Sequence, residues 1–174
     1  MNLFRRKSPL KEEAAIQMYL LATGQLTEAV LQQRVGEIEP LISSEDHKWD
    51  GRAGVWHTTF ASILYDLTSA HAALPQRQAS RISEAILSGL QEDPKSVQHL
   101  NIKQEYLDSM SQITPPVFGI ANALYDCLTD EQGNPLEFYM NKDKRMINSL
   151  GEMLQDITSQ NFWKQLKRTY NLVP

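Results

Sequence analysis

The histidines are the first residues to test for chemistry, because a suitably spaced pair can hold a metal ion. The chain has four of them, His47, His57, His71 and His99. His57 and His71 are fourteen residues apart, so on one helix they would lie about 20 Å apart along the axis and could not share an ion. The Glu-x-x-His and His-Glu-x-x-His patterns of helical metal sites are also missing. The sequence therefore predicts no metal centre and no cofactor.

The single cysteine and the glycines give no sign of a nucleophile or a phosphate-binding loop. Cys127 follows Leu124 by three residues and Ile120 by seven. That spacing places it on the apolar side of a predicted helix, where a buried thiol stays protonated and inert. The sequence has neither the Gly-x-Ser-x-Gly turn of serine hydrolases nor a Gly-x-x-x-x-Gly-Lys-Ser/Thr loop. These features favour a protein that is not an enzyme.

Charged residues are unevenly distributed, although the net charge is only −4. Acidic residues gather at positions 37–50, whereas basic residues enrich positions 142–168. A nucleic-acid interface needs a basic balance or a basic stripe, so we expect no nucleic-acid binding. Segregated charges can instead steer a protein partner, with aromatic residues as anchors. The predicted partner-binding residues are Glu45, Asp46, Trp49, Trp163 and Lys167. The alternative is ordinary solvated faces and two tryptophans that belong to the core.

A long amphipathic helix in the middle of the chain is the element around which we expect the others to pack. The spacing of apolar residues predicts a helix over Arg52–Leu74 with one apolar stripe and a polar opposite side. The stripe consists of Trp56, Phe60, Ile63, Leu67, Ala70 and Leu74. So broad an apolar face needs other helices to bury it, and no stretch of the chain shows the alternation typical of a strand.

Capping residues followed by proline mark the expected starts of further helices. The pattern occurs at Ser8-Pro9, Asp93-Pro94, Thr114-Pro115 and Asn134-Pro135, where the cap accepts a backbone N–H bond and proline needs none. Gly24 is expected to end the first helix, and a second helix is expected from Thr27 to about Gly36. Residues 37–51 are predicted to form the longest loop. Later helices are expected over 75–90, 94–110, 115–128, 135–157 and 162–170.

The predicted fold is all-α, an irregular bundle of about seven helices arranged as antiparallel hairpins, with no β-sheet. A length of 174 residues suits a single helical domain at residues 9–174, preceded by a flexible tail of residues 1–8. One cysteine and no clean signal peptide predict a cytoplasmic protein. No apolar run reaches the roughly 18 residues of a membrane span. Leu3–Lys7 could touch an acidic membrane surface, but we favour a solvated tail.

Two functions are compatible with this sequence. We favour a non-catalytic helical protein–protein interaction module, such as an adaptor, an inhibitor or a toxin-neutralising protein, because catalytic motifs are missing and charge is segregated. The alternative is a small-molecule-binding protein or an enzyme with a pocket between helices near His57 and His71, in which Tyr65 and Asp66 would take part. A cavity with convergent polar groups would favour the alternative. The sequence predicts neither the partner nor the oligomeric state.

Overall fold

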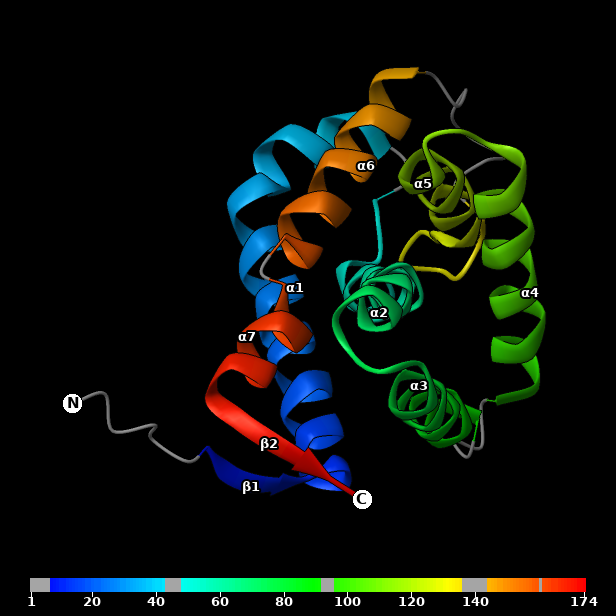
Figure 1. Cartoon of the computed structure of the whole chain (residues 1–174). Coiled ribbons are helices and arrows are strands. Elements are labelled where there is room, and N and C mark those ends of the chain that lie inside the picture. Colours follow the sequence, from blue (N-terminus) through cyan, green and yellow to red (C-terminus); the bar gives the residue numbers. More distant parts are fainter. Residues whose placement is uncertain (1–6, 43–47, 92–95, 136–143, 160) are drawn as a thin grey trace.

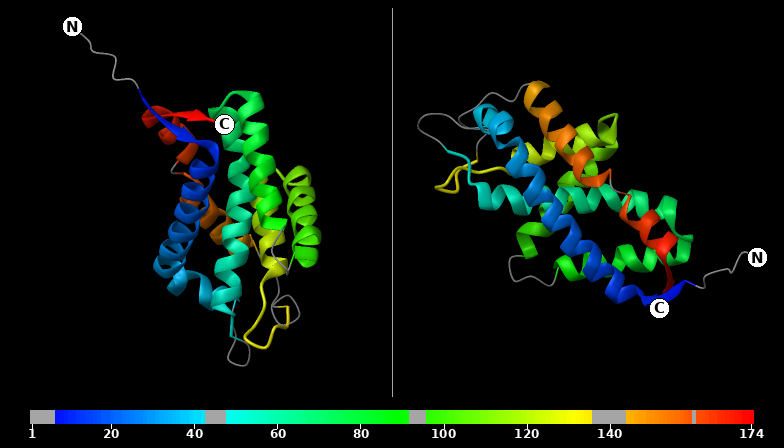
Figure 2. Two further views of the ribbon diagram at one scale, coloured as in Figure 1. Left: turned by 90° about the horizontal axis from the view of Figure 1, so that it is seen from below. Right: turned by 90° about the vertical axis from the view of Figure 1, so that its left-hand side faces the viewer.

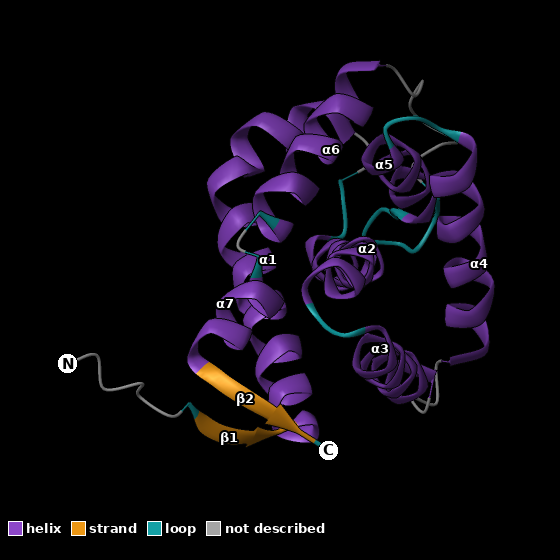
Figure 3. Cartoon of the chain, in the orientation of Figure 1, coloured by secondary structure: helices purple, strands orange, loops and turns teal. Residues whose placement is uncertain are grey.

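A computed structural model describes residues 7–42, 48–91, 96–135, 144–159 and 161–174 of the chain (Figure 1). Its elements are β1 (Ser8–Lys11), α1 (Glu12–Ile42), α2 (Gly51–Ala73), α3 (Gln76–Gln91), α4 (Ser96–Gln112), α5 (Pro116–Cys127), α6 (Lys144–Thr158), α7 (Phe162–Thr169) and β2 (Tyr170–Val173). Most described residues are therefore helical, and two short strands lie at one end (Figure 3). The predicted helical bundle is confirmed, with a small sheet in addition.

Helix α2 lies at the centre of the bundle and contacts α1, α3, α4, α5, α6 and α7 (Figure 1). Its bounds differ by one residue at each end from the predicted helix. The predicted stripe is buried from Phe60 to Leu74, and Trp56 is half-buried. This confirms that the apolar residues of the central helix are covered by its neighbours.

The side of α2 that was expected to be polar and outward is also buried. Thr58, Ser62 and Asp66 are at most 6% exposed. The Ser62 hydroxyl donates to the carbonyl oxygen of Thr58 at 2.7 Å, which satisfies this polar group inside the helix. The expectation failed because α2 contacts six other helices, which cover most of its middle and leave exposed residues, among those described, only at its two ends. As a result, Asp66 places a carboxyl group inside the bundle.

Helix α1 is continuous where two helices were predicted. It runs through Gly24 and Thr27 to Ile42, with Pro40 two residues from its end. Only Gly133 has positive φ among the glycines of the described ranges, so Gly24 does not adopt the left-handed cap that was expected. Glycine permits such a cap without requiring it. Packing against neighbouring helices, α6 among them, favours the unbroken helix, because Tyr19 and Val30 on the two sides of position 24 are both buried.

The two strands correct the prediction that the chain has no β-sheet. β1 and β2 pair in parallel, with Ser8 opposite Tyr170 and Lys11 opposite Val173. Ser8-Pro9 therefore begins a strand and not a helix, and Ser8 does not belong to a tail; residues 1–6 lie outside the described residues. Four-residue strands are too short to show an alternating pattern, and these two come from opposite ends of the sequence. Pattern analysis could not detect them for both reasons.

The remaining helices form hairpins that complete the bundle. Short connections join α2 to α3 and α4 to α5, and Figure 2 shows α1, α2 and α3 side by side when seen from below. Helix α5 begins at Pro116, one residue after the expected Pro115, and its N-cap makes no side-chain hydrogen bond. The expected start at Asp93-Pro94 lies outside the described residues, as do residues 136–143. Pro135 is described and forms an antiparallel β-bridge with Thr129, so it does not begin a helix as expected. Gly133 has a φ of 83°, in the left-handed region that favours glycine, and forms a turn after α5.

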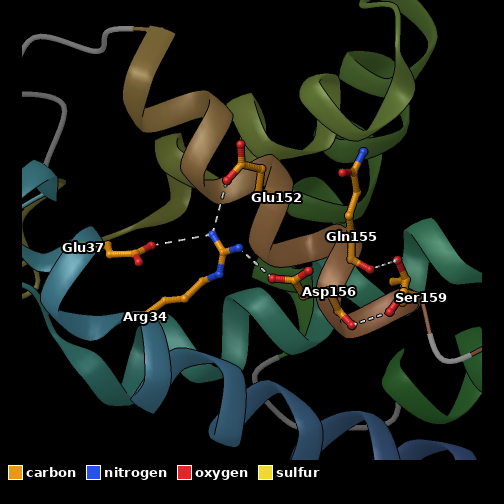
Figure 4. A network of polar contacts seen from close by, with 7 residues as sticks. Arg34, Glu37, Glu152, Gln155, Asp156 and Ser159 are labelled. Carbon is orange, nitrogen blue, oxygen red and sulfur yellow. Dashed lines mark hydrogen bonds and ion pairs between the residues drawn. The ribbon is translucent and has the colours of Figure 1, made fainter.

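Arg34 links the C-terminal half of α1 to α6 (Figure 4). Its guanidinium lies 2.7 Å from the carboxylate of Asp156, 3.5 Å from that of Glu152 and 3.8 Å from that of Glu37. The Ser159 hydroxyl donates to the Asp156 carbonyl oxygen at 2.9 Å and closes the last turn of α6. The carboxylates are at least half exposed, so each pair contributes at most about 1 kcal/mol. The network orients α6 on α1 more than it stabilises the fold.

Glu12, the first residue of α1, is a buried carboxylate that joins three elements. It accepts hydrogen bonds from Arg81 at 2.7 and 3.2 Å and from Gln78 at 2.8 Å, both on α3. Gln78 also donates to the carbonyl oxygen of Leu172 in β2. The bonds from Arg81 are the main reason that the pKa of Glu12 lies below its ordinary value of 4.5; burial opposes them, and Gln78 adds to them.

Acid is expected to weaken the Glu12 cluster. Because the pKa of Glu12 is lower in the folded chain, the contribution of Glu12 to stability is complete above its ordinary value of 4.5, which applies to the unfolded chain. That contribution is lost as the pH falls through the lowered folded value. Urea denaturation at a series of pH values should show a smaller acid-induced loss of unfolding free energy for Glu12→Gln than for wild type. The control is Glu13→Gln, at the exposed residue next to Glu12. Its unfolding free energy should change with pH as that of wild type does. Identical pH profiles for all three proteins would contradict the assignment.

No helix in the described part of the chain is both long and apolar enough to cross a membrane.

Candidate interaction site

Helix α7 presents one side to the core and a row of cations to solvent. Trp163 and Leu166, three residues apart, are 1% and 6% exposed. Lys164, Lys167 and Arg168 are exposed. This is the spacing of an amphipathic helix, and it confirms the helix predicted near the C-terminal end of the sequence.

An aromatic cluster holds α7 on α1. The Tyr19 ring on α1 lies 4.9 Å from the Trp163 ring and 5.4 Å from the Phe162 ring, measured between centroids. Phe162 and Trp163 meet edge to face at 5.3 Å. Such pairs add stabilisation of about 0.5–1.5 kcal/mol beyond their buried area. The position of the basic row therefore depends on the packing of Tyr19.

Two lysines bind the ends of helices beside α7. The Lys167 ammonium donates to the carbonyl oxygen of Ala73, the last residue of α2, at 3.0 Å. The Lys7 ammonium donates to the carbonyl oxygen of Lys167 in the last turn of α7. Cations are favoured at these positions because the carbonyl groups at the end of a helix carry partial negative charge. Together the two bonds join α2, α7 and the segment before β1.

A shallow pocket lies where these three segments meet. It has a volume of about 470 Å³ and is lined by Lys7, Ala72, Ala73, Asn161, Lys164, Lys167 and Arg168. Every ionisable residue that lines it is a cation, in a chain whose net charge is −4. We call Lys7, Lys164, Lys167 and Arg168 the basic pocket. Its chemistry suits an anionic group, which would meet several positive charges and no acidic lining residue.

The basic pocket contains one of the predicted partner-binding residues, Lys167. Trp163 lies beneath it, and an exposure of 1% makes its indole part of the core and not of the surface. Glu45 and Asp46 lie outside the described residues. Lys7 was not predicted, because it reaches α7 only through the pairing of β1 with β2. The positive charge of Lys164 and Arg168 was recognised in the sequence, but their common pocket was not.

Trp49 lies far from the basic pocket. Its ring packs against the start of α2, where a Cβ atom built on Gly54 would lie 2.1 Å from the ring. Lys167, in contrast, binds the last residue of α2. A helix of 23 residues is about 35 Å long. Trp49 and Lys167 therefore cannot form one compact binding surface.

The residues of the alternative hypothesis do not form one site around the histidines. His71 is exposed and lies 3.4 Å from the Ser83 hydroxyl, whereas His57 is half-buried beside Trp56. Asp66 instead lines a different pocket, with residues of α1. Across the described ranges, no group of three or more His, Cys, Asp or Glu side chains is placed to hold a metal ion.

The chain matches no protein-family model, no curated protein and no solved structure. Its function must therefore be inferred from the arrangement of its own residues.

Proposed function

We propose that this protein is a non-catalytic protein-interaction module that binds an acidic segment of a partner protein at the basic pocket. The supporting observation is that four cations and no acidic residue line one pocket of a chain with a net charge of −4. A long polyanion such as nucleic acid would also meet the acidic remainder of the surface. A short acidic segment would contact the pocket alone, which favours a protein partner.

The four cations would have two different roles in binding. Lys7 and Lys167 are tied to backbone carbonyl groups, so they hold the pocket in shape and contribute charge. Lys164 and Arg168 are exposed on α7 and can approach the partner directly. A guanidinium can bind a carboxylate with two parallel hydrogen bonds, which gives Arg168 the larger part in orienting the acidic segment.

We expect the affinity for an acidic peptide to depend on the positive charges of the basic pocket and not on the net charge of the protein. The probe is a fluorescein-labelled peptide of glutamate and aspartate residues, and its affinity is measured by fluorescence anisotropy at low and high salt. The double variant Lys164→Glu/Arg168→Glu spares both lysines that bind helix ends. We expect it to bind about tenfold more weakly than wild type. Wild-type affinity should fall as salt rises.

The matched control is Lys48→Glu/Lys144→Glu, which makes the same change in net charge at two exposed residues outside the pocket. It should retain most of the wild-type affinity. The same two variants and wild type can then be compared in affinity capture from native lysate, where the α7 variant should lose a partner that the control retains. Equal losses in both variants would show that only net charge matters and would refute the basic pocket as the binding site.

A further inference from the structure

A second pocket lies between α1, α2 and the junction of α6 with α7. Its volume is about 400 Å³, within the range of small-molecule sites. Tyr19, Thr23 and Leu26 line it from one face of α1, where they are three or four residues apart. Asp66 of α2 lines it from the centre of the bundle, and Ile157 and Phe162 line it from α6 and α7. The pocket therefore joins four helices.

Buried polar groups form one part of this pocket. Tyr19 is 1% exposed, and its hydroxyl has no partner among the described residues at ordinary hydrogen-bond distance and angle, although Asp66 and Thr23 lie near enough to shift its pKa. Asp66 is 6% exposed. Burial, and after it the negative charge of Asp66, raises the pKa of Tyr19 well above its ordinary value, so the phenol keeps its proton at neutral pH. A buried phenol without a hydrogen bond is costly, and an incoming polar group would remove that cost.

Apolar and aromatic side chains form the rest of the pocket. Leu26, Ile157 and Phe162 line it, and the rings of Tyr19 and Phe162 lie 5.4 Å apart at 59°. No Lys, Arg or His lines this pocket. Its lining thus combines a carboxyl group, a phenol and aromatic rings, in contrast to the cationic lining of the basic pocket.

We propose that this pocket binds a small organic amine, with the protonated amino group beside Asp66 and an aryl or alkyl body against Leu26, Ile157 and Phe162. An ammonium group is the natural partner of a buried carboxylate, because charge-assisted hydrogen bonds are strong where water is excluded. The ammonium N–H can also donate to the Tyr19 hydroxyl oxygen. Aromatic rings attract cations through their negatively polarised faces.

Other ligand classes fit this lining less well. An anion would meet the Asp66 carboxylate and no positive lining residue. A purely apolar molecule would cover the Tyr19 hydroxyl without offering it a hydrogen bond, which costs free energy. The expected ligand is therefore cationic at one end and apolar at the other, and one aromatic ring with a short aminoalkyl chain has this shape.

Three probes of similar shape test the proposal on the intact chain. 2-Phenylethylamine is positively charged at neutral pH, 2-phenylethanol is neutral and 3-phenylpropionate is negatively charged. Isothermal titration calorimetry at pH 7 should show that the amine binds at least about tenfold more tightly than the alcohol, and that the acid binds most weakly. This comparison uses the wild-type protein, so it does not depend on the folding of a variant.

Two variants test whether Asp66 causes the preference for the amine over the alcohol. Asp66→Asn should reduce the affinity for the amine by about tenfold and leave the affinity for the alcohol nearly unchanged. General damage to the pocket would instead weaken both ligands. Asp108→Asn, which changes an exposed carboxylate on α4, should keep the wild-type preference. The proposal is overturned if the amine and the alcohol bind wild type equally, if the acid binds best, or if no probe binds at millimolar concentration.

Discussion

Replacing Phe60 with alanine is expected to destabilise the protein by about 3–5 kcal/mol. Phe60 is 4% exposed in the middle of α2. Its ring stacks on Trp56 at a centroid distance of 5.3 Å and meets the Tyr106 ring of α4 at 5.9 Å. The substitution would leave a cavity between α2 and α4 that the surrounding helices cannot close. Because whole domains are stable by only about 5–15 kcal/mol, much of the population could unfold.

Urea denaturation followed by circular dichroism measures this loss. Leu21→Ala is the control, because Leu21 is 64% exposed on α1 and its removal should change stability by no more than about 0.5 kcal/mol. The slope of the transition should stay the same while its midpoint falls. A midpoint for Phe60→Ala close to that of Leu21→Ala would mean that Phe60 is not part of the core.

Replacing Gly119 with alanine is expected to be the most damaging addition of a single methyl group. A Cβ atom at this position would lie 2.2 Å from the Ser109 carbonyl oxygen and 2.9 Å from the Met110 Cα atom. Both are backbone atoms of α4, which cannot move aside as a flexible side chain can. Helices α4 and α5 would have to separate, and we expect a loss of about 3 kcal/mol.

Replacing Gly24 with alanine should instead increase the stability of the protein. A Cβ atom there would have no heavy atom of a packed neighbour within 4 Å, and the residue lies inside α1. Alanine is the better helix former, so Gly24→Ala should stabilise the protein by about 0.5–1 kcal/mol. Thermal and urea denaturation of the two variants provide the comparison. A stable Gly119→Ala protein would contradict the close packing of α4 on α5, and a destabilised Gly24→Ala protein would contradict an unbroken α1.

Elements with a strong local pattern could be predicted from the sequence. The apolar stripe of α2, the apolar face of α3 and the alternation of Trp163 and Leu166 with cations on α7 all fall within single helices. The continuity of α1 could not be predicted, because Gly24 is compatible with a helix end or a helix interior and packing against α6 decides between them. The pairing of β1 with β2 could not be predicted either, since it depends on residues at opposite ends of the chain.

The two pockets also contain features that the sequence pattern predicts and features that only the packing of distant segments creates. Lys167 was predicted from the basic composition of its segment, but Lys7 joins it only in the folded chain. Asp66 was named as a candidate on α2, yet its neighbour in the pocket is Tyr19 of α1 and not Tyr65 beside it in the sequence. Tyr19 and Leu26 share one wall only because α1 continues through Gly24. A sequence pattern identifies side chains that can take part in chemistry, whereas the packing of the helices determines which other residues lie beside them in a pocket.

The parallel pairing of Ser8 with Tyr170 also means that the basic pocket is assembled only when both ends of the described chain have come together. Closing a loop that spans almost the whole chain carries a large entropic penalty, so the two strands should join late, after the helices have brought them together. Lys7 precedes one strand and α7 precedes the other, and the basic pocket needs both. A chain that is still incomplete or partly folded would therefore lack the complete basic pocket, and under the proposed function its acidic partner would bind only the fully folded molecule.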